Sequence, residues 1–257
     1  MEKSDWPAWR LFVTGLSFTL FGLAGLVLGF LVFPGLLLLP GGQVSRRRRA
    51  RHIVQRALRL FVWIMDTLGG LSYEFDGAER LGREGQLIIA NHPTLLDVVF
   101  LVAFTPAPCC VVKAALWRNP FTRLVVQSTG YISNFPTDEM IEGSIAALEA
   151  GESLILFPEG TRTRPGQPMQ FHRGAASIAV RGARILTPVY ASCSPLTLTK
   201  FEPWYRIPPK RPHFSFAVGS DIDMEPYRSA PAPVASRALN KALLTHYLQR
   251  LAADGRQ

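Results

Sequence analysis

Near its start the chain has a long stretch without charge, and beyond it short apolar runs alternate with polar turns. Residues 11–39 are apolar or small throughout. This stretch exceeds the roughly 20 residues that a membrane-spanning helix needs, whereas the apolar core of a signal peptide has only about 7 to 15. The pattern therefore predicts a retained membrane anchor over residues 1–45.

Aromatic and basic residues flank this apolar segment. Trp6 and Trp9 precede it, as in an interfacial aromatic belt, and Arg46–Arg49 with Arg51 follow it and mark the cytoplasmic side. A single span therefore predicts a catalytic domain on the cytoplasmic face of the membrane, which in a bacterium is the inner membrane. The glycines and Pro34 leave a second possibility, a re-entrant hairpin with both of its ends in the cytoplasm.

Residues 46–70 combine arginines with apolar positions at helical spacing. The pattern predicts a basic amphipathic helix, which either lies on the membrane or packs on the domain that follows. Gly69 and Gly70 end this helix. Because the arginines adjoin an apolar segment, lipid headgroups fit them better than nucleic acid does.

Residues 71–257 read as one α/β domain, because short apolar runs alternate with helical patterns. Pro188 lacks a backbone N–H, so we expect its strand near an edge or a bulge. The predicted strands are Leu71–Phe75, Leu87–Ala90, Cys110–Lys113, Tyr131–Ser133, Ser153–Phe157, Ile185–Ala191 and Phe214–Val218. The predicted helices are Leu95–Phe104, Leu116–Gln127, Thr137–Ala150, Ala175–Val180 and Ala235–Leu251.

His92 follows one of these strands directly, and Asp97 lies five residues further on. In one interpretation, Thr94 and Asp97 form a capping box at the start of the next helix, and His92 is only a turn residue. In the other, the Asp97 carboxylate binds one imidazole nitrogen of His92 and leaves the other nitrogen as a general base. A capping role for Thr94 is compatible with both.

A second apolar strand, Ser153–Phe157, also ends in a polar cluster, and open α/β sheets gather their chemistry at the carboxyl ends of strands. The two clusters read Asn91-His92-Pro-Thr-Leu-Leu-Asp97 and Phe157-Pro-Glu-Gly-Thr-Arg162. In this order they resemble the motifs of the glycerolipid acyltransferase family, typified by 1-acylglycerol-3-phosphate acyltransferases. The resemblance implies a central mixed sheet flanked by helices.

Weaker motifs extend the resemblance over residues 73–192. Lys113-Ala-Ala-Leu116 with Pro120, Phe171-His-Arg-Gly174 and Thr187-Pro188-Val189 are each similar to a family element. One position departs from the pattern. Four residues after Ile132 the family usually carries an arginine that helps to hold the phosphate of the acceptor, and this chain has Pro136 there.

The resemblance implies a membrane-bound O-acyltransferase in which His92 is the base and Asp97 holds it. The guanidinium of Arg162 suits a phosphate, and Glu159 beside Gly160 either orients the acceptor or braces Arg162. Together with Thr161, these residues form the predicted substrate-binding motif. Lys113, at the end of its strand, is a further candidate to hold a phosphate as a point charge.

The formal net charge of +9 favours acidic partners, and acyl-CoA and acyl-carrier protein both fit as donors of the acyl group. Three cysteines give no disulfide framework and no metal spacing, and the chain has no Gly-x-Ser-x-Gly, Walker or dinucleotide motif. We therefore expect no metal and no bound cofactor. Direct attack by the hydroxyl of the acceptor needs a base on the enzyme rather than a nucleophile.

Alternatives remain for the acceptor and for the class of function. The resemblance favours a lysophospholipid such as lysophosphatidic acid, whereas Pro136 leaves open another acceptor, such as an ornithine-type or aryl-polyene lipid. Residues 200–213 interleave aromatic and basic side chains, as either a membrane-facing or acceptor-contacting loop or a plain surface loop. A non-catalytic lipid- or carrier-binding module is the rival from another class. Net charge alone supports nucleic-acid binding, and we predict none.

Overall fold

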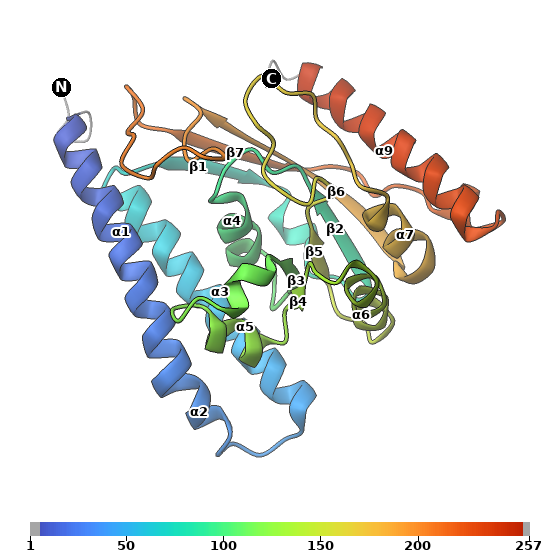
Figure 1. The fold of residues 1–257 in the computed structure, drawn as a ribbon, viewed down its shortest axis with the longest axis horizontal. Coiled ribbons are helices and arrows are strands. Elements are labelled where there is room, and N and C mark those ends of the chain that lie inside the picture. Colours follow the sequence, from blue (N-terminus) through green and yellow to red (C-terminus); the bar gives the residue numbers. More distant parts are fainter. Residues whose placement is uncertain (1–5, 254–257) are drawn as a thin grey trace.

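A seven-stranded sheet forms the centre of the computed structural model, which describes residues 6–253 (Figure 1). The first five residues of the predicted anchor and the last four of the predicted domain lie outside the described residues. The strand order is β1-β7-β6-β2-β5-β3-β4. The strands are β1 (Ser72–Asp76), β2 (Gln86–Ala90), β3 (Cys109–Val112), β4 (Ile132–Ser133), β5 (Leu154–Leu156), β6 (Ile185–Ser194) and β7 (His213–Val218).

Neighbouring strands run parallel except for β6 and β7, which are antiparallel, so the predicted α/β fold with a central mixed sheet is confirmed. Helices cover both faces of this sheet (Figure 1). The helices are α1 (Pro7–Val27), α2 (Phe33–Leu36), α3 (Gln43–Thr67), α4 (Asp97–Phe104), α5 (Arg123–Thr129), α6 (Thr137–Glu149), α7 (Arg173–Gly182), α8 (Glu225–Arg228) and α9 (Ala232–Ala253).

Strand β2 lies at the centre of this arrangement, between β6 and β5, and all five of its residues are buried. Successive side chains of a strand point to opposite faces. Leu87 and Ile89 accordingly join the core under α6, α7 and α9, while Ile88 and Ala90 join the core under α3 and α4. A strand that is buried on both faces requires a continuously apolar sequence. The position of β2 in turn fixes the place at the edge of the sheet where the polar residues after Ala90 begin.

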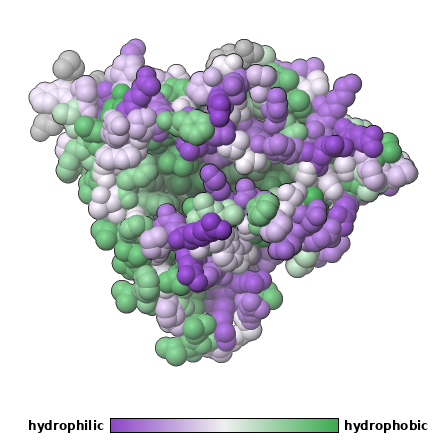
Figure 2. All heavy atoms as spheres, viewed as in Figure 1, coloured by the Kyte–Doolittle hydropathy of each residue, from purple (hydrophilic) through white to green (hydrophobic). Residues whose placement is uncertain are grey.

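The apolar N-terminal segment is one helical run from Pro7 to Leu36, in which a π-helical turn, Leu28–Val32, joins α1 to α2. By length and composition it is the one helix among residues 6–253 that is able to cross a membrane. In Figure 1 it runs alongside α3, and Figure 2 shows hydrophobic side chains gathered along this edge of the molecule. The arginine run lies within α3, which begins at Gln43.

Glycines let α1 and its π-helical extension approach the domain closely. A Cβ on Gly25 would collide with the backbone carbonyl of Phe121, and a Cβ on Gly29 would lie 2.8 Å from Leu124 Cβ. Small residues allow two backbones to meet at this spacing. This helical run is therefore packed against the loop before α5 and against α5 itself.

Two predicted elements were wrong. The helix expected over Leu116–Gln127 is a 3₁₀ turn, Ala114–Trp117, followed by the separate helix α5, because Asn119 and Pro120 form a turn between them. Pro188 lies in β6, an inner strand between β2 and β7, and its register with β2 is continuous, so it is neither at an edge nor at a bulge. The missing N–H is tolerated because β7 ends at Val218, the partner of Val189, and the next residue, Gly219, only donates to the Pro188 carbonyl.

We expect Gly25→Val to force α1 away from the domain, because the added side chain meets a backbone atom that has no freedom to rotate away. Overpacking of this kind costs about 1–3 kcal/mol of unfolding free energy. Thermal unfolding in detergent measures the loss. Gly35→Val in the same helical run is the matched control, because a Cβ at Gly35 has no atom within 4 Å. Equal midpoints for the two variants would contradict this packing.

Candidate active site

The side chain of Asn91 fixes the chain where it leaves β2. Its Nδ2 donates to the carbonyl of Ala191 and its Oδ1 accepts from the N–H of Ala191, both at 2.8 Å. Asn91 is buried, so these two bonds lie in a low-dielectric environment and tie the end of β2 to β6. The next residue, His92, is thereby held at the carboxyl end of the central strand.

His92 and Asp97 form the predicted pair, with 2.9 Å between Nδ1 and Oδ2. Asp97 is 1% exposed and also accepts from the Thr94 N–H at 2.7 Å and from the Thr94 hydroxyl at 2.6 Å. The Asp97 carboxylate thus binds both Thr94, ahead of α4, and the imidazole, so His92 is more than a turn residue and the role of Thr94 accompanies the pair. Since a carboxylate only accepts, Nδ1 carries the donated proton, and Nε2 of the neutral ring is free to accept.

Phe157, at the end of β5, packs on the imidazole. The ring centroids of His92 and Phe157 lie 4.1 Å apart and their planes meet at 24°. One face of the imidazole is therefore covered, and Asp97 fixes its rotation. Only 16% of the His92 side chain is exposed.

Glu159 contacts the histidine loop and not Arg162. Its Oε1 accepts from the backbone N–H of His92 at 2.8 Å, and its Oε2 accepts a short bond from the Thr163 hydroxyl. The Thr163 N–H in turn donates to the His92 carbonyl at 3.1 Å. Burial, with a smaller contribution from the charge of Asp97, raises the pKa of Glu159 to about 7 although the His92 N–H opposes the shift. The two sequence motifs thus form one hydrogen-bonded unit.

Arg162 binds backbone rather than a carboxylate. Its Nη1 donates to the carbonyls of Leu198 at 2.8 Å and Thr199 at 3.0 Å. Both belong to residues 195–212, between β6 and β7, which we call the strap. Burial lowers the pKa of Arg162 from its usual range, and the negative charge of Asp97 opposes that effect.

The remaining predicted site residues are placed differently. Gly160 adopts a left-handed conformation, φ 65°, and a Cβ there would lie 3.0 Å from His172 Cδ2. Thr161 is exposed and lines a polar pocket beside Glu159. Lys113 follows β3 and is exposed. The described residues that line the polar pocket do not include it.

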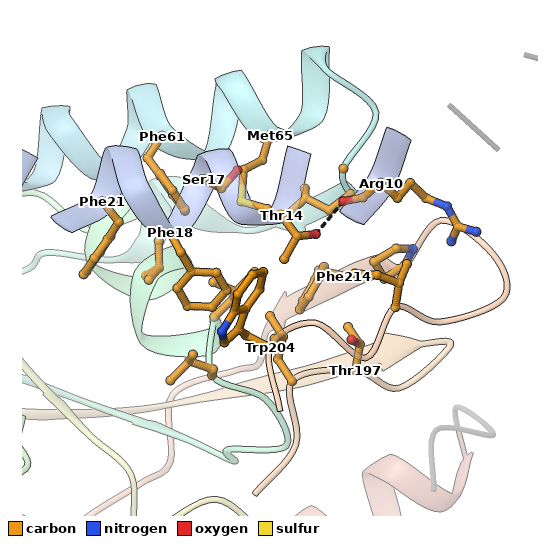
Figure 3. Close-up of a pocket in the computed structure, with 18 of the residues that line it drawn as sticks. Arg10, Thr14, Ser17, Phe18, Phe21, Phe61, Met65, Thr197, Trp204 and Phe214 are labelled. Atoms are coloured by element: carbon orange, nitrogen blue, oxygen red, sulfur yellow. Dashed lines mark hydrogen bonds between the residues drawn. The ribbon is translucent and has the colours of Figure 1, made fainter. Parts of the chain in front are cut away.

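An apolar cavity of about 230 Å³ adjoins the entrance of α4 (Figure 3). Leu95 and Leu96, between Thr94 and Asp97, line it. Helix α1 and the strap provide much of the remaining wall, and Trp204 of the strap packs on Phe18 with 5.7 Å between ring centroids. The buried guanidinium of Arg10 donates to the carbonyls of Pro208 at 2.7 Å and Pro209 at 3.0 Å, which joins the strap to α1.

Comparison with known proteins gives matches to acyltransferases over part of the chain. The family model described as Acyltransferase matches residues 72–192. A curated 1-acyl-sn-glycerol-3-phosphate acyltransferase of Pseudomonas aeruginosa is 26% identical over 149 residues, or 56% of this chain and 58% of that protein. The corresponding Saccharomyces cerevisiae enzyme is 29% identical over 152 residues, or 55% of this chain and 50% of that protein. Over residues 72–192 the chain matches the glycerolipid acyltransferase family.

The crystal structure of the 1-acyl-sn-glycerophosphate acyltransferase from Thermotoga maritima has the same fold as this chain. The TM-score is 0.64 at 18% identity, over 92% of this chain and 97% of the other. The curated relatives are matched over only part of their length, 58% for the Pseudomonas aeruginosa protein and 50% for the yeast protein.

Sequence reasoning missed several residues that hold the candidate site in place. Asn91 and Thr163 lie within the matched motifs or next to them, yet spacing alone gives no sign that they bind backbone atoms of β6 or of the histidine loop. Phe157 was predicted as the last residue of a strand and the first of its motif, but not as a ring that packs on His92. The polar pattern of the strap marked a loop but not its contact with Arg162.

We expect Glu159 to make stability depend on pH. Because its pKa in the folded chain lies above the usual 4.5, the stability that it contributes is full below about pH 4.5 and is lost as the pH rises through about 7. Relative to the wild type, Glu159→Gln should therefore gain stability between pH 5 and pH 8, by up to about 3 kcal/mol. Thermal midpoints in detergent measure this difference.

Glu139→Gln is the matched control for this measurement, because Glu139 is exposed at the start of α6. A constant difference between wild type and Glu159→Gln across this pH range would contradict the raised pKa of Glu159.

Proposed function

We propose that this protein is a membrane-bound O-acyltransferase that moves a fatty acyl group from acyl-CoA or acyl-carrier protein to the hydroxyl of a lysophospholipid resembling 1-acylglycerol 3-phosphate. The observation that carries the proposal is the pair of His92 and Asp97, which is fixed at the carboxyl end of the central strand beside an apolar cavity. The names of the curated relatives agree with this reaction.

In this reaction His92 Nε2 takes the proton of the acceptor hydroxyl while the hydroxyl oxygen attacks the thioester carbonyl. The C–O bond forms, the C–S bond breaks, and His92 returns the proton to the departing thiol. Asp97 holds the Nδ1 proton and stabilises the imidazolium that forms between these steps. Glu159 and Thr163 act through the backbone of His92 and are positioning residues.

The apolar cavity fits the fatty acyl chain of the donor, because its lining is almost entirely hydrophobic and it begins at the residues between Thr94 and Asp97. Helix α1 lines the cavity with one face and exposes the large apolar side chains of Phe12 and Leu23 on others, and the π-helical turn that follows exposes Phe30. We infer that these exposed side chains contact membrane lipid, and that the domain lies on the cytoplasmic face.

We expect His92→Ala to lower the rate of acyl transfer about a hundred- to ten-thousand-fold, because that is the usual contribution of a positioned general base. Transfer from radiolabelled acyl-CoA or acyl-carrier protein to lysophosphatidic acid measures the rate in membranes. His52→Ala, on α3, is the matched control. Activity of His92→Ala within a few-fold of wild type would contradict the assignment of the base. Absence of transfer by the wild type with either donor and any lipid acceptor would favour a binding module.

Chain-length preference tests the role of the cavity. Thr14 of α1 lines the cavity, so Thr14→Phe should shorten it and lower kcat/KM for long acyl donors about tenfold relative to short ones, the effect of excluding about two methylene groups. Thr19→Phe is the control, since Thr19 is exposed and makes the same type of hydroxyl bond to the carbonyl four residues earlier. An unchanged ratio in Thr14→Phe would place the donor chain elsewhere.

A further inference from the structure

A polar pocket of about 490 Å³ lies beside the active site, next to the strap. Glu159 and Thr163, which bind the backbone of His92, form part of its wall. The strap separates this pocket from the apolar cavity, because Leu198 lines the cavity and Lys200 lines the pocket. Both spaces thus adjoin the segments that hold His92: Leu95 and Leu96 line the apolar cavity, and Glu159 and Thr163 line the polar pocket.

The wall of the pocket carries an excess of positive charge. The described residues that line it include three cations, Arg162, Arg164 and Lys200. They include one carboxylate, that of Glu159. The Glu159 oxygens already accept from His92 and Thr163. In the part of the chain that the structure describes, neither Arg164 nor Lys200 forms an ion pair with a carboxylate.

Phe201 lies next to both of these cations. The Arg164 guanidinium lies 4.8 Å from the centroid of its ring, and Lys200 Nζ lies 5.5 Å from it. Two like charges repel, so cation–π contact with one ring offsets part of the cost of holding them together. Phe201 itself has φ 70°, a conformation that a bulky residue rarely adopts. The backbone of the strap thus holds this ring within reach of both cations at a cost in strain.

We propose that Arg164 and Lys200 bind a phosphate group of a substrate in this pocket. The inference deepens the proposed acyl transfer and rests on it for the identity of the substrate. A phosphate oxygen is the acceptor that a guanidinium and an ammonium both favour, and its charge balances the two cations. Arg162 is less available for this role, because one of its terminal nitrogens already donates to Leu198 and Thr199.

The pocket also bears on the departure at Pro136. Pro136 is exposed at the entrance of α6, and it is not among the described residues that line the polar pocket. Arg164 and Lys200 reach the phosphate from a different side, from the loop after β5 and from the strap. Loss of an arginine at position 136 is therefore compatible with a phosphate-bearing substrate.

Two sources of phosphate have this chemistry, the headgroup of a lysophospholipid acceptor and the phosphopantetheine arm of the donor. The pocket adjoins the residues that hold His92, and in a glycerophosphate acceptor the phosphate lies only a few bonds from the reacting hydroxyl. The arm of the donor places its phosphate much farther from the thioester. The geometry thus favours the acceptor.

Binding of sn-glycerol 3-phosphate to the full chain in detergent tests the site without requiring turnover. In a His92→Ala background, Arg164→Gln with Lys200→Gln should raise the dissociation constant at least tenfold, because two charge-assisted contacts are lost. Arg237→Gln with Lys241→Gln on α9 is the matched control, since it removes the same charges from exposed positions. Equal affinity in the two double variants would overturn the site even if the protein is an active acyltransferase.

Steady-state kinetics with an otherwise wild-type chain identify the source of the phosphate. The Arg164→Gln, Lys200→Gln variant should have an apparent KM for lysophosphatidic acid raised at least tenfold, with the KM of the acyl donor within twofold of wild type. A rise in the donor KM alone would overturn the assignment to the acceptor and place the phosphopantetheine phosphate in the pocket. Unchanged KM values for both substrates would overturn the proposal.

Discussion

The buried carboxylate of Asp97 is the contact on which the site depends. It accepts three hydrogen bonds, from the His92 ring, the Thr94 N–H and the Thr94 hydroxyl. A carboxylate that is 1% exposed needs such partners, because an unpaired buried charge is strongly destabilising. The same bonds that stabilise the charge also fix the start of α4 and the orientation of the imidazole, so the fold and the proposed chemistry share one requirement.

The strap connects this site to the two proposed substrate-binding spaces. Arg162 holds it near Leu198, and Arg10 of the N-terminal helix holds it near Pro208. Between these two arginines the strap closes the apolar cavity on one side and borders the polar pocket on the other. The N-terminal helix is consequently part of the proposed binding site as well as the candidate membrane anchor.

Sequence patterns predicted the sheet and the pair of His92 and Asp97, because strong local signals encode both. Leu87–Ala90 is continuously apolar, and it forms the buried centre of the sheet. Contacts between distant segments left no such signal. Pro188 was predicted near an edge because it lacks an N–H. Whether a strand needs that N–H depends on where the neighbouring strand β7 ends, and the sequence around Pro188 does not show this. Arg162 was predicted from its motif as a phosphate ligand, whereas the strap that binds one of its nitrogens comes from a segment 36 residues further on.

The rate of acyl transfer by Asp97→Asn in a single turnover tests the central claim most directly. An amide at this position has only one oxygen for three donors, and its NH₂ group opposes at least one of them, so the imidazole loses its fixed tautomer. With the protein still folded, as judged by its circular dichroism spectrum and thermal midpoint, the account predicts a fall of at least a hundredfold in the rate. A rate within a few-fold of wild type would show that Asp97 only caps α4 and that His92 does not need it to act as the base.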